Sequence, residues 1–272
     1  MNRTSISDIK TKAKDNLLGC YGLATGSFAL LFAILYGLMA VLMGALMAGM
    51  SPLELNSGTS STLTEIKSVG ISLVSGAFSA LLTTGYSYLM MEVSYGRRPK
   101  VKDIFYCFTH HPDKIIIVYA ILTAIQWVLL LPSRRVQWSP EKLLTTDGKK
   151  FLLWVVLLLA GLLIGMFISI IFGFSFLIYV DDPDMSVKDI MMCSQKLMRG
   201  NIFRYIYLIL SFIGYALLGI LSLGVTLMFT VPYQNMAVVE FYKDALSNVD
   251  RRNTSENQSD NRTIDVEIGN ED

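Results

Sequence analysis

Long uncharged apolar segments alternate with short polar ones along this chain. The longest, Phe151–Val180, contains no charged residue, and one helix of that length would rise about 45 Å, more than the ~30 Å hydrocarbon core of a bilayer. Three further uncharged segments are Tyr21–Met50, Ser68–Met91 and Ile115–Leu131. We expect Pro132 to end the helix formed by the last of them. The pattern predicts an all-α, polytopic membrane helical bundle.

The last apolar segment, Tyr205–Val239, is too long for one membrane span and slightly too short for two. Extending it from Ile202 to Tyr242 supplies the roughly 40 residues that two spans need. A hairpin is expected at Ser222–Gly224, and Pro232 is expected to kink the final helix. We therefore predict six transmembrane helices in total.

Three short amphipathic segments, near residues 5–18, 101–108 and 186–198, lie beside these spans. The first carries an apolar stripe at helical spacing, formed by Ile6, Ile9, Ala13 and Leu17. Ser5 and Ser186 are predicted N-caps, each with an aspartate three residues later. The segments are predicted to be surface helices on the cytoplasmic side of the membrane.

A similar four-residue sequence begins each of these surface helices. It reads Ile-Ser-Asp-Ile at 6–9 and Val-Lys-Asp-Ile at both 101–104 and 187–190, so the aspartates at the repeated position are Asp8, Asp103 and Asp189. The spacing predicts a three-unit internal repeat, with units at about 5–95, 96–180 and 181–246. The alternative is chance similarity, because helix ends in any polytopic protein resemble one another.

The C-terminal residues 247–272 differ in composition from the rest of the chain. They contain seven acidic residues, three arginines and few large apolar side chains, which predicts a disordered acidic tail. Residues 1–246 then form a single membrane domain.

Composition and charge restrict the partners and the orientation. The chain is 53% hydrophobic and has a formal net charge of +1, so it has no overall positive field for nucleic acid, and membrane lipids are the expected partners. In the six-span topology, seventeen of the 23 Lys and Arg residues fall in inner segments. The positive-inside rule then predicts a multi-pass protein of the plasma membrane with cytoplasmic N- and C-termini.

Three carboxylates, Glu92, Asp181 and Glu240, are predicted at the inner ends of the second, fourth and sixth spans. If the repeated units surround one axis, these groups would form a ring at a cytoplasmic vestibule, where carboxylates are functional candidates. The alternative is that each one reaches water or pairs with a nearby cation. The available cations are Arg97, Lys188 and Lys243.

Other polar side chains give weaker signals. Gln234 and Asn235 follow Pro232, which frees backbone carbonyls at membrane depth, so we count them as candidate functional residues. Cys107 and His111 are one helical turn apart, but two ligands without a second pair do not make a metal site. No motif of a hydrolase, a phosphate-binding loop or a dinucleotide site occurs. We therefore predict no metal, no cofactor, no catalytic residue and no enzymatic activity, with all three cysteines reduced.

A known family is similar to this chain at Ser211–Gly224, Val231–Met236, Phe241–Asp244, Asp181-Asp-Pro-Asp-Met-Ser and Met198-Arg-Gly-Asn. It is the bacterial integral-membrane family catalogued as domain of unknown function 975. The resemblance implies a polytopic membrane protein, commonly from Gram-positive bacteria and distantly like the membrane domain of glycerophosphodiester phosphodiesterases. It implies no established activity and no catalytic residues.

These observations lead to three functional hypotheses. The first is a non-enzymatic protein whose helices form a groove for a lipid or amphiphile, with a role in transport or envelope homeostasis. The second is an assembly or regulatory partner of another membrane protein complex, which would use the acidic tail for docking. The third is an intramembrane hydrolase.

Overall fold

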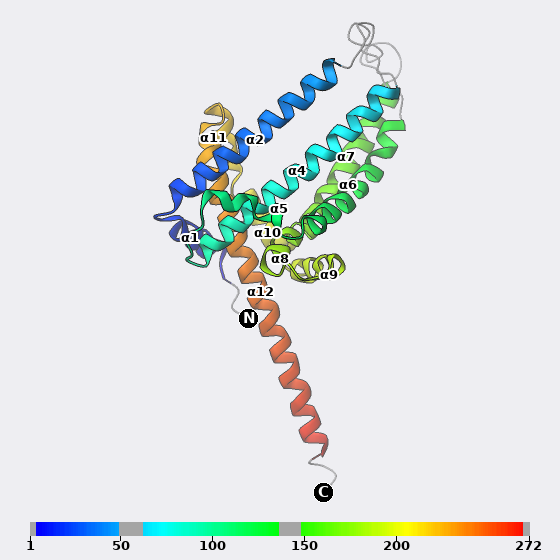
Figure 1. Cartoon of the computed structure of the whole chain (residues 1–272). Coiled ribbons are helices and arrows are strands. Elements are labelled where there is room, and N and C mark those ends of the chain that lie inside the picture. Colours follow the sequence, from blue (N-terminus) through cyan, green and yellow to red (C-terminus); the bar gives the residue numbers. More distant parts are fainter. Residues whose placement is uncertain (1–3, 49–61, 136–147, 269–272) are drawn as a thin grey trace. The chain divides into compact units, whose positions relative to one another are not determined.

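In the computed structural model, the backbone is described for residues 4–48, 62–135 and 148–268. Every regular element of these residues is a helix (Figure 1). Five helical segments are long and apolar enough to cross a membrane: Tyr21–Ala45, Ile66–Ser94, Pro112–Ser133, Lys150–Asp181 and Ile202–Leu221. The chain is therefore all-helical, and its apolar helices indicate a multi-pass membrane protein. The polar segments 51–64 and 132–150, which separate these apolar helices in the sequence, lie largely outside the described residues.

The internal contacts divide the chain into two compact units that interleave in sequence. The first contains the chain up to Thr25, the segment Met90–Pro99 and the chain from Gln195 onward. The second contains Gly26–Leu89 and Lys100–Ser194. The predicted repeat of three consecutive units is a different division of the chain, and it stays a prediction.

The core of the first unit is the contact of α1 (Ile6–Leu17) with α12 (Val225–Ile268). The buried side chains of α1 are Ile9, Ala13 and Leu17, and those of α12 include Ala237, Phe241 and Ala245. Ile9, Ala13 and Leu17 belong to the apolar stripe that the sequence predicts for α1. In the structure this stripe is buried in protein, because α12 supplies an apolar face of its own.

Two short helices, α10 (Ile202–Leu210) and α11 (Ile213–Leu221), precede α12 in the first unit. The chain turns between α11 and α12 at Ser222–Gly224, where the sequence predicts a hairpin. Gly224 adopts a φ of +91°, which glycine tolerates without a steric cost. A Cβ on Gly219 would lie 2.5 Å from Leu227, so the missing side chain lets α11 approach α12 closely.

Helix α12 continues to Ile268. The sequence predicts a disordered tail from residue 247, whereas the structure continues the helix through most of that segment. The physical reason is that adding residues to an existing helix needs no new nucleation step.

Most of α2 (Tyr21–Ala48) and most of α4 (Thr62–Ser94) belong to the second unit, and the two helices correspond to the first two predicted spans. Where a surface helix is predicted next, the structure has a short 3₁₀ helix, η1 (Val101–Phe105), followed by α5 (Tyr106–Thr109). A Cβ on Gly85 of α4 would collide with the backbone carbonyl of Ile104. This glycine therefore lets η1 pack directly against α4.

Helices α6 (Pro112–Arg135) and α7 (Gly148–Phe172) pack side by side in the second unit (Figure 1). A Cβ on Gly161 would lie 2.9 Å from the Leu129 carbonyl oxygen, which explains why a small residue is needed there. The prediction that Pro132 ends the third span is wrong, because α6 continues to Arg135. A proline removes only one intrahelical hydrogen bond, and the last turn tolerates that loss.

The segment Phe151–Val180 is not a single helix, contrary to the prediction. It breaks at Gly173-Phe174, and α8 (Ser175–Asp181) follows. The chain then leads to α9 (Val187–Met198), which is the third predicted surface helix. The Lys114 ammonium donates to the backbone carbonyls of Pro183 and Met185 at 2.6 and 3.2 Å, and these bonds hold the connection between α8 and α9 against α6.

Candidate functional site

A buried carboxylate, Glu240 of α12, is the centre of a polar cluster in the first unit. It is 7% exposed. Its Oε1 atom accepts hydrogen bonds from Asn16 Nδ2 of α1 at 2.9 Å and from Lys243 Nζ one turn further along α12 at 3.1 Å. The hydroxyl of Ser94, at the end of α4, donates a short hydrogen bond to the same oxygen. Three helices therefore meet at this carboxylate.

Lys243 extends this cluster. Its ammonium donates to the Ser94 hydroxyl at 2.7 Å and to the Ser94 carbonyl at 3.1 Å. It also lies 4.9 Å from the centre of the Tyr95 ring, within range of a cation–π interaction. A buried carboxylate is costly unless it is paired and hydrogen-bonded, and the cluster meets both conditions for Glu240.

A second ion pair lies one residue beyond Lys243 on α12. Asp244 accepts from Arg204 of α10 at 2.9 Å and from the Thr4 hydroxyl at 2.5 Å. Arg204 also donates to the Thr4 carbonyl at 2.7 Å and lies 5.3 Å from the centre of the Phe241 ring. The two clusters together fix the register of α1 and α10 on α12.

Glu92 lies in the same unit but not in the polar cluster of Glu240. Its carboxylate pairs with Arg97 at 2.7 Å, and the Arg97 side chain is 67% exposed. An ion pair this open to water contributes little to stability. For Glu92 and Glu240, the structure thus has the pairing with a nearby cation that the sequence left as the alternative.

Asp181, at the end of α8, belongs to the second unit and is exposed. The vestibule formed by three carboxylates stays a prediction. Gln234 is half-buried in α12, and the Asn235 side-chain amide donates to the Val231 carbonyl of its own helix at 2.9 Å. This bond uses one of the two N–H donors of the Asn235 amide, beside Pro232.

The three repeated aspartates lie at helix starts, with different hydrogen bonds. The backbone N–H of Asp8 donates to Ser5 Oγ at 3.1 Å, and that of Asp189 donates to Ser186 Oγ at 3.3 Å. These bonds confirm both predicted serine caps. Asp103 instead accepts from the backbone N–H of Lys100 at 2.7 Å, which is the carboxylate half of a capping box.

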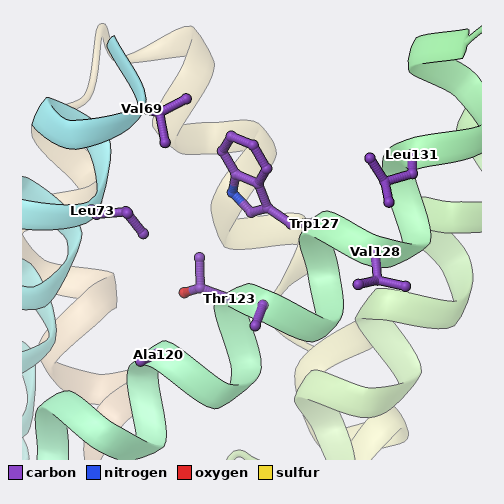
Figure 2. Close-up of a pocket in the computed structure, with 8 residues that line it drawn as sticks. Val69, Leu73, Ala120, Thr123, Trp127, Val128 and Leu131 are labelled. Carbon is purple, nitrogen blue, oxygen red and sulfur yellow. The ribbon is translucent and has the colours of Figure 1, made fainter. Parts of the chain in front are cut away.

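The second unit contains an apolar groove between α4 and α6 (Figure 2). Its volume is about 400 Å³. The lining residues are Val69 and Leu73 from α4, and Ala120, Thr123, Ala124, Trp127, Val128 and Leu131 from α6. The hydroxyl of Thr123 and the indole N–H of Trp127 are the polar side-chain groups of this lining, so the groove suits a hydrocarbon chain better than a charged group.

A second cavity of about 330 Å³ adjoins the other side of α6, between α6, α7 and α8. It shares Thr123 and Trp127 with the groove and adds polar groups from Gln126 and Ser169. The Gln126 side chain lies so close to Gly165 of α7 that a Cβ there would collide with its amide oxygen.

Comparison with known protein families assigns this chain to a family. The family described as "Protein of unknown function (DUF975)" matches residues 1–249. The chain belongs to this family. No curated protein and no solved structure matches it, so the distant likeness to glycerophosphodiesterases is not shown and stays a prediction.

The DUF975 match includes both the polar cluster of Glu240 and the apolar groove, because both lie within residues 1–249. Among the described residues, no group of three or more His, Cys, Asp or Glu side chains could hold a metal ion. Cys107 is fully buried, and this burial raises the pKa of its thiol to about 12. Its neighbour His110 stacks on Tyr106, with ring centres 4.0 Å apart.

The sequence indicated some residues of this DUF975 protein and missed others. The place of Glu240 after a long apolar segment marks it as a candidate. The sequence does not mark Asn16, Ser94 or Asp244, because their hydrogen-bond partners are distant in sequence. The pair Ala120 and Ala124, one turn apart on α6, is the sequence signal for an open helix face that could have indicated the groove.

Proposed function

We propose that this DUF975 protein is a non-enzymatic, multi-pass protein of the bacterial plasma membrane that binds the acyl chain of a lipid or amphiphile. The observation that carries the proposal is the groove between α4 and α6. Its volume of about 400 Å³ falls within the range of small-molecule sites, and its lining is apolar. A role in lipid transport or envelope homeostasis would follow from such binding.

The surroundings of the groove favour entry of the chain from the bilayer. Val128 and Leu131 at the groove are 63% and 45% exposed. In a bilayer, exposed apolar side chains contact lipid tails, so the groove would be continuous with the lipid phase. Thr123 and Trp127 are too few and too weakly polar to bind a charged headgroup, which supports hydrocarbon as the occupant.

Native mass spectrometry of the full-length protein tests this proposal. Ala120→Phe places a ring in the groove, and Ala160→Phe adds the same ring at an exposed position of α7. We expect the wild type and Ala160→Phe to retain a phospholipid or fatty acid, and Ala120→Phe to bind it about tenfold more weakly. Equal retention by all three proteins would contradict the proposal, as would the absence of any bound lipid in the wild type.

We further propose that α12 supplies a sixth span through Val225–Tyr242, and that both termini are cytoplasmic. Two observations support this topology: the turn at Ser222–Gly224 and the packing of α11 against α12. The distribution of lysine and arginine agrees with it. Topology reporters fused after residues 56, 140 and 223 should lie outside the cell, and a reporter fused after residue 250 should lie in the cytoplasm. An external reporter at residue 250 would contradict six spans.

A second candidate function is the docking of a membrane protein partner on the C-terminal part of α12. One observation favours it. The helix continues to Ile268, well past Glu240 and Asp244, and its last residues carry the excess of acidic groups. Deletion of residues 250–272 should then release co-purified proteins without changing lipid retention. Unchanged co-purification after this deletion would exclude the docking role.

A further inference from the structure

Lys10 of α1 has an unusual environment in the first unit. Its ammonium lies 4.7 Å from the centre of the Phe212 ring. Among the described residues no carboxylate forms an ion pair with it. The residue is half-buried, and this burial lowers the pKa of its ammonium. A partly desolvated cation whose partner is an aromatic face still has three N–H donors for an anion.

Two tyrosines surround the same aromatic ring. The ring centres of Tyr215 and Tyr233 lie 6.0 and 5.2 Å from that of Phe212, and 6.4 Å from each other. The Tyr233 hydroxyl donates to the Lys10 carbonyl at 3.4 Å, which ties α12 to this part of α1. In the part of the chain that the structure describes, the Tyr215 hydroxyl has no hydrogen-bond partner. Lys10 and Tyr215 therefore offer unused donors beside one ring.

The surroundings of these donors are positive on one side and apolar on the other. Lys14, one turn further along the same face of α1, is exposed and adds positive charge that attracts anions. On α11, Ile213 and Leu217 are 49% and 57% exposed and can contact hydrocarbon. A ligand that matches both sides has a negative headgroup and an acyl chain.

We propose that Lys10 and Tyr215 bind the phosphate group of an anionic phospholipid. Lysine binds phosphate as a point charge, and the tyrosine hydroxyl adds a directional hydrogen bond. The flanking surface of α11 takes the adjoining part of the lipid chain. This site lies in the first unit and shares no residue with the groove, so it does not depend on the proposed function.

Native mass spectrometry of the full-length protein with phosphatidylglycerol, and with diacylglycerol of the same chains, tests the proposal. Lys10→Gln removes the charge, and Lys12→Gln removes the same charge from an exposed position of the same helix. Tyr215→Phe removes only a hydroxyl, and Tyr207→Phe is its exposed counterpart on α10. Thermal unfolding of each variant confirms that it is folded.

We expect the wild type to bind phosphatidylglycerol more tightly than diacylglycerol. Lys10→Gln should weaken phosphatidylglycerol about tenfold or more, and Tyr215→Phe about threefold to tenfold. Both control variants should bind like the wild type. Displacement of the lipid by millimolar inorganic phosphate would support the phosphate site and identify the free ion as a competing ligand. Equal binding of the two lipids, or equal effects of Lys10→Gln and Lys12→Gln, would overturn the proposal.

Discussion

The carboxylate of Glu240 has donors from three helices, Asn16 of α1, Ser94 of α4 and Lys243 of α12. Removing one partner from such a cluster leaves the others buried without compensation, and this costs more than the pair itself contributes. At the residue scale, Glu240 therefore holds these helices in position, and its removal should lower the stability of the folded protein.

We expect Glu240→Ala to lower the free energy of unfolding by about 1–3 kcal/mol. This is below the ~3–5 kcal/mol typical of a fully buried ion pair, because the Lys243 side chain is 28% exposed. Unfolding of the purified protein in detergent measures the change. Glu92→Ala is the control, since the pair with Arg97 is largely open to water, and it should cost less than about 1 kcal/mol. Equal losses in the two variants would contradict the account.

Cys107 gives a prediction about pH. Its thiol is fully buried, and burial raises its pKa to about 12. A raised pKa keeps the thiol protonated, and the thiolate is the reactive form. N-ethylmaleimide should therefore leave Cys107 unmodified between pH 7 and 9 in the folded protein, while the half-buried Cys20 and Cys193 react. Mass spectrometry of the labelled peptides checks this, and labelling of Cys107 before unfolding would contradict it.

At the scale of single helices, close packing depends on particular glycines. Gly85→Ala should destabilise the protein by about 1–3 kcal/mol, because the new Cβ meets the Ile104 backbone carbonyl, which cannot rotate away. Gly70→Ala, in the same helix and with no atom within 4 Å of the new Cβ, should be neutral or stabilising by up to about 1 kcal/mol. Unfolding experiments on the two variants compare them directly, and equal effects would show that η1 does not pack as described.

The rate of hydrogen exchange should differ between the two ends of α12. Residues 236–245 contain buried side chains that pack in the first unit, whereas Asn, Ser, Thr and Asp dominate after residue 250 and are weak helix formers. Hydrogen exchange should therefore be slow at 236–245 and fast after 250. Equally slow exchange up to Ile268 would indicate that the C-terminal part of the helix is held by contacts beyond its own backbone bonds.

Sequence patterns predicted local features of these helices better than their breaks. The caps at Ser5 and Ser186 and the turn at Ser222–Gly224 follow from residue types and were predicted. The break at Gly173-Phe174 was not, because an uninterrupted apolar segment gives no polar signal at the point where a helix changes direction. The sequence also does not predict the groove, because its residues come from two helices, α4 and α6, and only tertiary packing brings them together.

At the scale of the whole molecule, five apolar helical segments among the described residues indicate a multi-pass membrane protein, and the chain belongs to the DUF975 family. The two compact units carry different chemistry. The first contains buried ion pairs that fix helix positions, and the second contains the apolar groove. The proposed function assigns acyl-chain binding to the second unit, and the polar cluster of the first unit is not required for it.

Photocrosslinking tests acyl-chain binding most directly. A phospholipid with a diazirine on its acyl chain is incorporated with the full-length protein into vesicles, illuminated, and the modified peptides are mapped by mass spectrometry. The account predicts labelling concentrated at Leu73, Ala120 and Trp127, and a marked loss of this labelling in Ala120→Phe. Labelling spread evenly over exposed apolar residues such as Leu163 and Leu217, without enrichment at the groove, would contradict it.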